Sequence, residues 1–175
     1  LERRWRRMEG TGNYTKLFTT VCYYGTNVNL DVSMKILICG LPGSGKSTLA
    51  EPFAKLISGV WINADQVREQ YNDWDFTQGG RMRQAQRMRY LSDGVVRAGG
   101  IAVADFVCPT DEARKQFDAD YTVWMDTIKK GRFEDTNAMF QTPKNVDYHV
   151  AAWFHDTHAQ LLEVVQNYME RDKNV

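Results

Sequence analysis

A glycine-rich loop that ends in Lys-Ser carries the clearest chemical signal in this sequence. The loop, Gly-Leu-Pro-Gly-Ser-Gly-Lys-Ser-Thr over residues 40–48, directly follows an apolar run. Glycines let backbone N–H groups turn onto phosphate oxygens, Lys46 can reach the β- and γ-phosphates, and the Ser47 hydroxyl is a ligand for Mg²⁺. The residues predicted to bind nucleotide phosphates are Gly40, Leu41, Pro42, Gly43, Ser44, Gly45, Lys46, Ser47 and Thr48.

The surroundings of this loop favour the same interpretation. Residues 35–39 are typical of a buried parallel strand, and residues 47–57 are typical of a helix. A strand–loop–helix unit is the setting that a phosphate loop (P-loop) needs, because the helix amino terminus adds a partial positive charge. Pro52 lies inside the predicted helix and lacks an N–H, so we expect a kink or a local loosening there.

The rest of the chain alternates between predicted strands and helices. Further strands are expected at residues 59–63, 101–107, 121–125 and 146–152, and further helices at 64–71, 81–98, after the turn 108–110 as far as Gln116, and from Thr157 onward. This alternation predicts an α/β fold, a doubly wound parallel sheet of about five strands flanked by helices, as in P-loop NTPases. Ligands of such sheets bind at the carboxyl ends of strands, where Asp65, Asp105 and Cys108 fall.

Composition limits the size of the fold and the class of partner. A chain of 175 residues with 43% apolar residues can bury one α/β core but hardly two. The formal net charge is zero, so no basic field attracts nucleic acid or anionic lipid, and no apolar run reaches membrane-spanning length. We therefore expect a small-molecule partner. Three widely spaced cysteines without a C-x-x-C pair are typical of a reducing cytoplasm.

Residues 1–33 differ from the rest and are predicted to be an extension, flexible or passively packed, before a domain over residues 34–175. The extension has a basic cluster at residues 3–7 and then a stretch without a sustained period. Contact with RNA or phospholipid is the alternative. The segment is not typical of a secretory signal, since no uninterrupted apolar stretch follows the arginines. Three histidines, His149, His155 and His158, lack the spacing of a zinc site.

Beyond the P-loop, several segments together resemble the adenylylsulfate (APS) kinases, which use MgATP to phosphorylate the ribose 3′-hydroxyl of adenosine 5′-phosphosulfate. The similar segments are 40–50, Asn-Ala-Asp-Gln-Val-Arg at 63–68, Asp-Trp-Asp-Phe-Thr at 73–77, Arg81, Phe-Val-Cys-Pro at 106–109, and Phe133, Phe140 and Pro143. A P-loop is generic to kinases, whereas Phe76, Arg81 and Phe133 together are more specific.

The resemblance implies roles for charged residues. Lys46 and Asp65 would be catalytic, with Asp65 accepting the proton of the acceptor hydroxyl or holding a Mg²⁺-bound water; the alternative for Asp65 is a plain helix N-cap. Arg68 and Arg81 would pair with the phosphosulfate, since a guanidinium group suits two-pronged oxyanion contacts. The alternative for both arginines is a solvated helix face.

The resemblance also implies how the acceptor is held. Phe76 and Phe133 would stack on its adenine, although phenylalanine is more often a core residue. Further contacts to the acceptor are implied for Gln84, Val107 and Cys108. The loop around Phe76 is rich in polar residues and glycine and offers little core for it to join, which favours stacking.

This sequence departs from the family at four of these positions. Asn63 replaces an aspartate, Gln84 an asparagine, Cys108 a serine, and Asp105 stands where serine is usual. Cys108 is expected to be an inert apolar residue. Asp105 can take over part of the metal role that Asn63 has lost, so the predicted Mg²⁺ ligands are Ser47, Asp65 and Asp105.

A deletion is the largest departure. Between Asp126 and Phe133 the family has a longer basic lid, and here Thr-Ile-Lys-Lys-Gly-Arg remains. The short lid would leave the phosphates more exposed to water. Lys129, Lys130 and Arg132 can still supply positive charge to the phosphoryl group; an exposed turn is the alternative.

The expected function is thus ATP- and Mg²⁺-dependent phosphorylation of adenosine 5′-phosphosulfate to PAPS, a step of sulfate activation. Two alternatives remain open: a kinase of another acceptor, such as a nucleoside, a sugar or a polynucleotide 5′-end, and an ATP-binding module that hydrolyses little. A GTPase is disfavoured because no Asn-Lys-x-Asp motif is present. The sequence does not fix the oligomeric state, and a homodimer is compatible with it.

Overall fold

The computed structural model describes residues 32–172. The predicted extension over residues 1–33 therefore lies almost entirely outside the described residues. Within them, strands and helices alternate along the chain, except that two consecutive helices separate the second strand from the third.

Five parallel strands form one sheet in the order β2-β3-β1-β4-β5. Their bounds are β1 Met34–Gly40, β2 Val60–Asn63, β3 Ile101–Asp105, β4 Tyr121–Met125 and β5 Tyr148–Val150. All seven residues of β1 are buried, as expected for the central strand of a sheet covered on both faces. The predicted five-stranded, doubly wound parallel sheet is confirmed.

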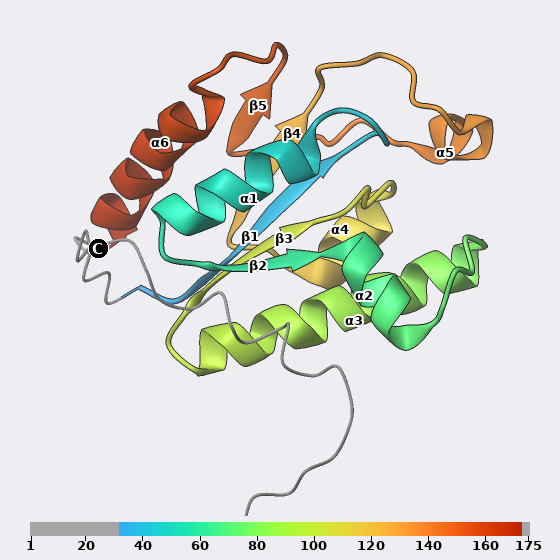
Figure 1. Cartoon of the computed structure of the whole chain (residues 1–175), viewed down its shortest axis with the longest axis horizontal. Helices are drawn as coiled ribbons and strands as arrows, with labels where there is room; N and C mark the ends of the chain where they lie inside the picture. Colours follow the sequence, from blue (N-terminus) through green and yellow to red (C-terminus); the bar gives the residue numbers. More distant parts are fainter. Residues whose placement is uncertain (1–31, 173–175) are drawn as a thin grey trace, which may run out of the picture.

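Helices cover both faces of the sheet (Figure 1). Their bounds are α1 Lys46–Leu56, α2 Ala64–Tyr71, α3 Gln78–Arg97, α4 Asp111–Phe117, α5 Glu134–Met139 and α6 Thr157–Asp172. α1 and α6 pack together on one face, and α2, α3 and α4 lie on the other. This arrangement leaves the loops after β1, β2, β3 and β4 at one edge of the sheet.

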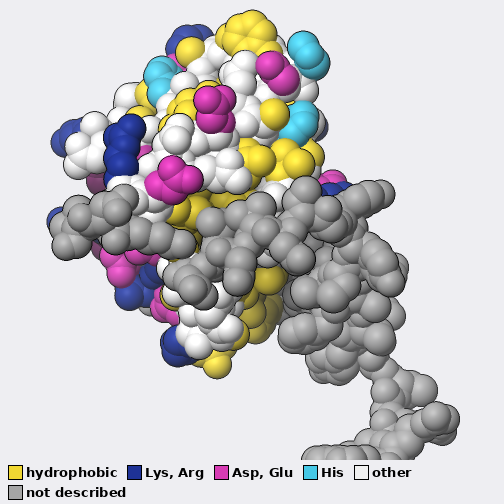
Figure 2. All heavy atoms as spheres, turned by 90° about the vertical axis from the view of Figure 1, so that its left-hand side faces the viewer, with side chains coloured by type: hydrophobic (Ala, Val, Ile, Leu, Met, Phe, Trp, Pro, Cys, Tyr) yellow, Lys and Arg dark blue, Asp and Glu magenta, His cyan; other side chains and the backbone are white. Residues whose placement is uncertain are grey.

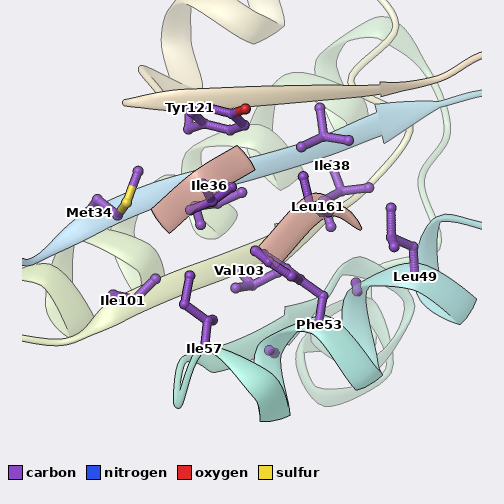
Figure 3. Close-up of a cluster of buried hydrophobic side chains, with 14 of the residues drawn as sticks. Met34, Ile36, Ile38, Leu49, Phe53, Ile57, Ile101, Val103, Tyr121 and Leu161 are labelled. Atoms are coloured by element: carbon purple, nitrogen blue, oxygen red, sulfur yellow. The ribbon is translucent and has the colours of Figure 1, made fainter. Parts of the chain in front are cut away.

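Each face of the sheet has its own apolar cluster. On the α1 and α6 side, Ile36 and Ile38 of β1 meet Phe53 of α1 and Leu161 of α6 (Figure 3). On the other side, Leu37 and other alternate strand residues meet α3 and α4. Alternate residues of a strand point to opposite faces, so β1 contributes to both clusters.

Several element boundaries differ from the sequence prediction. α3 begins at Gln78 rather than Arg81, because the Thr77 side chain accepts a hydrogen bond from the Gly80 N–H and caps the helix three residues earlier. α5 was not predicted as a helix. α1 stays continuous through Pro52, which lies inside it.

Positive and negative side chains are mixed on the face that Figure 2 draws, in keeping with the net charge of zero. In the part of the chain that the structure describes, no helix combines the length and the hydrophobicity needed to cross a bilayer.

Candidate active site

The P-loop lies between the end of β1 and the start of α1. Gly40, Gly43 and Gly45 have φ angles of +150°, +92° and +88°, a region that L-residues with side chains rarely adopt. A Cβ atom on Gly40 would also overlap the carbonyl oxygen of Met125 on the neighbouring strand. Glycine is thus required at these positions, and the loop can present N–H groups to an anion at the amino terminus of α1.

Lys46 starts α1 and turns back toward the loop. Its Nζ donates a hydrogen bond to the carbonyl oxygen of Leu41 at 2.9 Å. Burial lowers the pKa of Lys46, and the nearby carboxylate of Asp105 opposes this effect. The ammonium group therefore lies beside the loop, where a phosphate would supply the negative charge that it needs.

Asp105 ends β3 and is the most tightly bonded carboxylate near the P-loop. It is only 2% exposed. Its Oδ2 accepts a hydrogen bond from the Ser47 hydroxyl at 2.5 Å, and its Oδ1 accepts one from the indole Nε1 of Trp61 at 2.8 Å. The Asn63 amide donates to both oxygens, at 3.0 and 3.2 Å. Burial raises the pKa of Asp105, and these donors oppose the rise.

The oxygen atoms of Ser47 and Asp105 suit a Mg²⁺ ion that the protein binds together with a nucleotide. They do not suit a metal that the protein would hold by itself. Mg²⁺ usually keeps several waters and binds one or two protein oxygens together with nucleotide phosphates. Ser47 and Asp105 provide hard oxygen donors in direct contact with each other. Among residues 32–172 no cluster of three or more His, Cys, Asp or Glu side chains could hold a metal without the nucleotide. The donor set therefore fits a metal that arrives with ATP.

Asp65 lies in the first turn of α2, with its side chain exposed. Asn63 is the N-cap of this helix, because its Oδ1 accepts hydrogen bonds from the N–H groups of Asp65 and Gln66. The alternative role of Asp65 as the N-cap is therefore wrong. Its carboxylate makes no hydrogen bond or ion pair with another residue in the described range, so it is free to meet a substrate.

Arg68 and Phe76 belong to one packed unit. Arg68 is buried, and its NH1 donates to the carbonyl oxygens of Asp73 and Asp75 at 2.9 and 3.0 Å. Its guanidinium carbon lies 4.5 Å from the centre of the Phe76 ring. The solvated-face alternative for Arg68 is therefore wrong. The arginine holds the loop after α2, and 49% of Phe76 stays exposed above it.

Arg81 connects this loop to α5. Its Nε donates to the carbonyl oxygen of Phe76 at 2.8 Å, and its NH2 donates to Asp135 Oδ2 and Thr136 Oγ1 at 2.8 and 3.0 Å. The Arg81 side chain is 11% exposed, so it too is no solvated residue. Phe133 immediately precedes α5 and is 55% exposed. The Arg81 guanidinium group thus links the backbone of Phe76 to the first turn of the helix that follows Phe133.

The short segment after β4 packs against the P-loop. The Thr127 hydroxyl donates to the carbonyl oxygen of Ser44 at 2.7 Å. A Cβ atom on Gly131 would lie 3.1 Å from the carbonyl oxygen of Pro42, and Asn137 of α5 bonds both the N–H and the C=O of Gly131. We call residues 126–132 the brace, since they join the P-loop to α5.

Two of the three basic residues in the brace have carboxylate partners. Lys129 pairs with Asp126 at 2.8 Å and Lys130 with Glu134 at 2.9 Å, and all these contacts are partly or fully exposed. Arg132 is exposed and makes no ion pair with residues 32–172. The charge of Arg132 is thus not neutralised within the described residues, which is compatible both with the predicted phosphoryl contact and with the exposed-turn alternative.

The remaining predicted acceptor contacts are buried or half-buried. Gln84 is buried, and its Nε2 donates to the carbonyl oxygen of Ala64 while its Oε1 lacks a partner among the described residues. Val107 is half-buried and its carbonyl oxygen accepts from the Gly40 N–H. Cys108 is 1% exposed, and burial raises the pKa of its thiol well above the ordinary value. A thiol in this state is inert at neutral pH.

Two residues near the site carry no recognisable sequence signal. Trp61 belongs to a predicted strand, and no local pattern indicates that its indole N–H donates to the carboxylate of Asp105. Trp153, in the loop before α6, is 40% exposed, and its ring lies 3.7 Å from the position of a Cβ atom on Gly45. Its place beside the P-loop depends on the return of the chain from β5, which no local pattern reveals.

Comparison with known families agrees with this geometry. The family model described as adenylylsulphate kinase matches residues 32–130, more than half of the chain. The chain belongs to the adenylylsulphate kinase family. No curated protein matches the sequence. Membership of this family, with the P-loop fold, identifies the protein as a kinase that transfers phosphoryl groups from ATP.

Solved structures of several small-molecule kinases share the fold. An APS kinase from Mycobacterium tuberculosis in complex with AMPPNP and APS is 16% identical, with 77% of this chain and 98% of that chain covered and a TM-score of 0.66. A sugar kinase from Janibacter sp. is 14% identical, with coverage of 79% and 95% and a TM-score of 0.60. A shikimate kinase from Acinetobacter baumannii in complex with shikimate is 14% identical, with coverage of 80% and 97% and a TM-score of 0.56. At these identities the likeness extends to the fold alone.

Proposed function

We propose that this protein transfers the γ-phosphoryl group of MgATP to the ribose 3′-hydroxyl of adenosine 5′-phosphosulfate, giving PAPS. On the donor side the proposal rests on the P-loop, with Lys46 and the Ser47–Asp105 pair beside it. Ser47 would bind Mg²⁺ directly and Asp105 would hold one of its waters. The metal, when bound with the nucleotide, neutralises charge on the β- and γ-phosphates.

The acceptor side rests on one observation. Arg81 bonds the backbone of Phe76 and the first turn of α5, which follows Phe133, and both phenylalanine rings are about half exposed. Exposed aromatic rings on two segments that one largely buried arginine side chain ties together are suited to stack on a purine. Asp65 is the carboxylate that we assign to accept the proton of the acceptor hydroxyl, because it is exposed and unpaired within the described residues.

A second candidate is a kinase of another small acceptor. Arg68 and Arg81, which the family resemblance assigns to the phosphosulfate, are already occupied by protein oxygens. An acceptor with less negative charge would not need both guanidinium groups. The neighbours with solved structures include sugar and shikimate kinases. An ATP-binding module of low turnover is a third candidate, supported by the short brace.

An acceptor panel distinguishes these candidates. ADP release is measured with APS, nucleosides, sugars and shikimate for the unchanged protein, Phe76→Ala and Phe133→Ala. We expect APS to be turned over and each variant to raise its KM about tenfold or more, since stacking on one base contributes about 1–3 kcal/mol. The KM for ATP should stay within about twofold.

Trp74→Ala is the matched control, because Trp74 is an equally exposed aromatic residue 6.4 Å from the Phe76 ring centre. Turnover of another acceptor with APS inert would identify the second candidate. ATP binding without acceptor-dependent ADP release would identify the third.

A further inference from the structure

Trp61 gives the carboxylate of Asp105 a donor that the proposed reaction does not itself require. The residue lies on β2, where Trp61 pairs with Val103 and Asn63 pairs with Asp105 on β3. Residues two apart on a strand point to the same face, so the indole and the Asn63 amide both reach Asp105 from one side. The distance from Trp61 Nε1 to Asp105 Oδ1 is 2.8 Å.

The two carboxylate oxygens of Asp105 have different donors. Trp61 bonds Oδ1, whereas the Ser47 hydroxyl bonds Oδ2 at 2.5 Å. Asn63 contacts both oxygens, and its own Oδ1 is fixed by the N-cap of α2. An indole N–H can only donate, and an ionised carboxylate can only accept. This bond therefore has one possible direction, and it opposes rotation of the carboxylate.

We propose that Trp61 is a positioning residue for the nucleotide-bound Mg²⁺. By holding Oδ1, its indole N–H keeps Oδ2 of Asp105 on Ser47, the residue that would bind the cation. The inference rests on the proposed MgATP site, and it concerns how tightly that site binds the metal rather than which acceptor is used. Asn63 stands where the family has an aspartate and carries no charge to attract the cation. Binding of Mg²⁺ therefore depends more strongly on how the carboxylate of Asp105 is oriented than it would in a site with both carboxylates.

The test measures ADP affinity by calorimetry on the full chain, once with Mg²⁺ and once with EDTA. Trp61→Phe removes the N–H and keeps an aromatic ring. We expect it to reduce the Mg²⁺-dependent gain in affinity about tenfold, the usual effect of losing a hydrogen bond to a charged group. Affinity in EDTA should stay within about twofold. Trp124→Phe, on β4 and stacked on His149, is the control and should change neither value.

Two further variants separate positioning from packing. Trp61→His returns a ring N–H at the same position of the five-membered ring and should restore most of the Mg²⁺-dependent gain. In Asp105→Asn, adding Trp61→Phe should have no further effect on that gain. Mn²⁺ bound in the presence of ADP, measured from the loss of the free-ion EPR signal, should follow the same order.

Each other result overturns the assignment. An unchanged gain in Trp61→Phe, or equal weakening with Mg²⁺ and EDTA, would leave Trp61 a packing residue, as would failure of Trp61→His to restore the gain. Should the unchanged protein bind ADP with no help from Mg²⁺, or not at all, the proposed function itself fails together with this inference.

Discussion

At the scale of single residues, Lys46 shows how the site is held ready for an anion. Its ammonium group is half-buried and donates to the carbonyl oxygen of Leu41. Burial lowers its pKa because the charged form loses hydration that one carbonyl oxygen does not replace. An incoming phosphate oxygen would restore that balance, and this favours phosphate over water beside Lys46.

Replacing Lys46 by methionine should abolish most catalysis with little cost to the fold. We expect Lys46→Met to reduce turnover at least about a hundredfold, the usual effect of losing a charge-stabilising group. The free energy of unfolding should change by about 1 kcal/mol or less, since one carbonyl oxygen loses its donor. Steady-state kinetics and urea unfolding measure the two effects. Lys55→Met, in an exposed ion pair with Glu51 on the same helix, is the control. Retained turnover in Lys46→Met would contradict the assignment.

The residues of the P-loop could be predicted from sequence, whereas their neighbours could be predicted only in part. The glycines at 40, 43 and 45 could be assigned to the loop because its positive φ angles restrict these positions to glycine. The role of Arg68 as a loop anchor was not predictable, since its carbonyl partners lie five and seven residues ahead in an irregular turn. Similarly, the position of Asp105 on its strand was clear, but its three donors come from two other elements, Ser47 from α1 and Trp61 and Asn63 from β2.

At the scale of elements, a carboxylate network shapes the turn between α2 and α3. Asp73 accepts hydrogen bonds from Arg83, Arg87 and the backbone N–H of Asp75, and these donors hold the pKa of its carboxyl well below the ordinary value. The hydroxyl and the N–H of Thr77, followed by Arg83, lower the pKa of Asp75 to about 2. The loop that presents Phe76 is therefore organised by ionised carboxylates.

This network should make the fold sensitive to acid. Because both carboxyls have a lower pKa in the folded state than in the unfolded chain, their stabilisation is present above the unfolded-state pKa of about 4 and is lost progressively as pH falls below it, for Asp73 over a wider range than for Asp75. We expect Asp73→Asn to be less stable than the unchanged protein at pH 6, and the difference to shrink by pH 2.5. Urea unfolding at both values measures it.

Glu69→Gln provides the control, because this exposed carboxylate of α2 makes no ion pair within residues 32–172. It should alter stability little at either pH. A difference between Asp73→Asn and the unchanged protein that is constant with pH would show that the ionised form of Asp73 is not what stabilises the turn.

The accuracy of the sequence prediction differs from one element to another. α2 and β4 have the predicted bounds, because each is a regular run with a clear start and stop. α5 was missed because six residues, Glu134–Met139, are too few to display a period and its N-cap residue, Phe133, makes no side-chain capping bond. Tertiary contacts, from Arg81 and Gly131, stabilise it instead.

At the scale of the whole molecule, the carboxyl ends and the amino ends of the strands have different roles. The P-loop follows the carboxyl end of β1, whereas Lys35 lies near its amino end. Lys35 is buried, and its Nζ contacts Asp93 of α3 at 2.8 Å and the carbonyl oxygen of Phe117 at 3.4 Å. The ion pair joins the central strand to the helical layer far from the candidate site.

Breaking this ion pair should reduce stability without changing catalysis. In Asp93→Asn the buried ammonium of Lys35 loses its close counter-charge, so we expect the free energy of unfolding to fall by about 2 kcal/mol. This loss is smaller than that for a completely buried pair because the Asp93 side chain is 27% exposed. The KM values should stay the same. Urea unfolding and steady-state kinetics check both statements. Asp118→Asn, 3.9 Å from Lys35 and 66% exposed, should cost about 0.5 kcal/mol or less; equal losses in the two variants would argue against a special role for Asp93.

The strand order has a consequence for biosynthesis. β1 is made first, yet its partners are β3 and β4, which end at Asp105 and Met125. A nascent chain that has emerged only as far as α3 therefore carries a strand that is apolar except for Lys35, with neither neighbour to pair with. At about 5–20 residues per second, the ribosome needs several seconds to deliver both partners. During that interval we expect β1 to be a binding site for a chaperone.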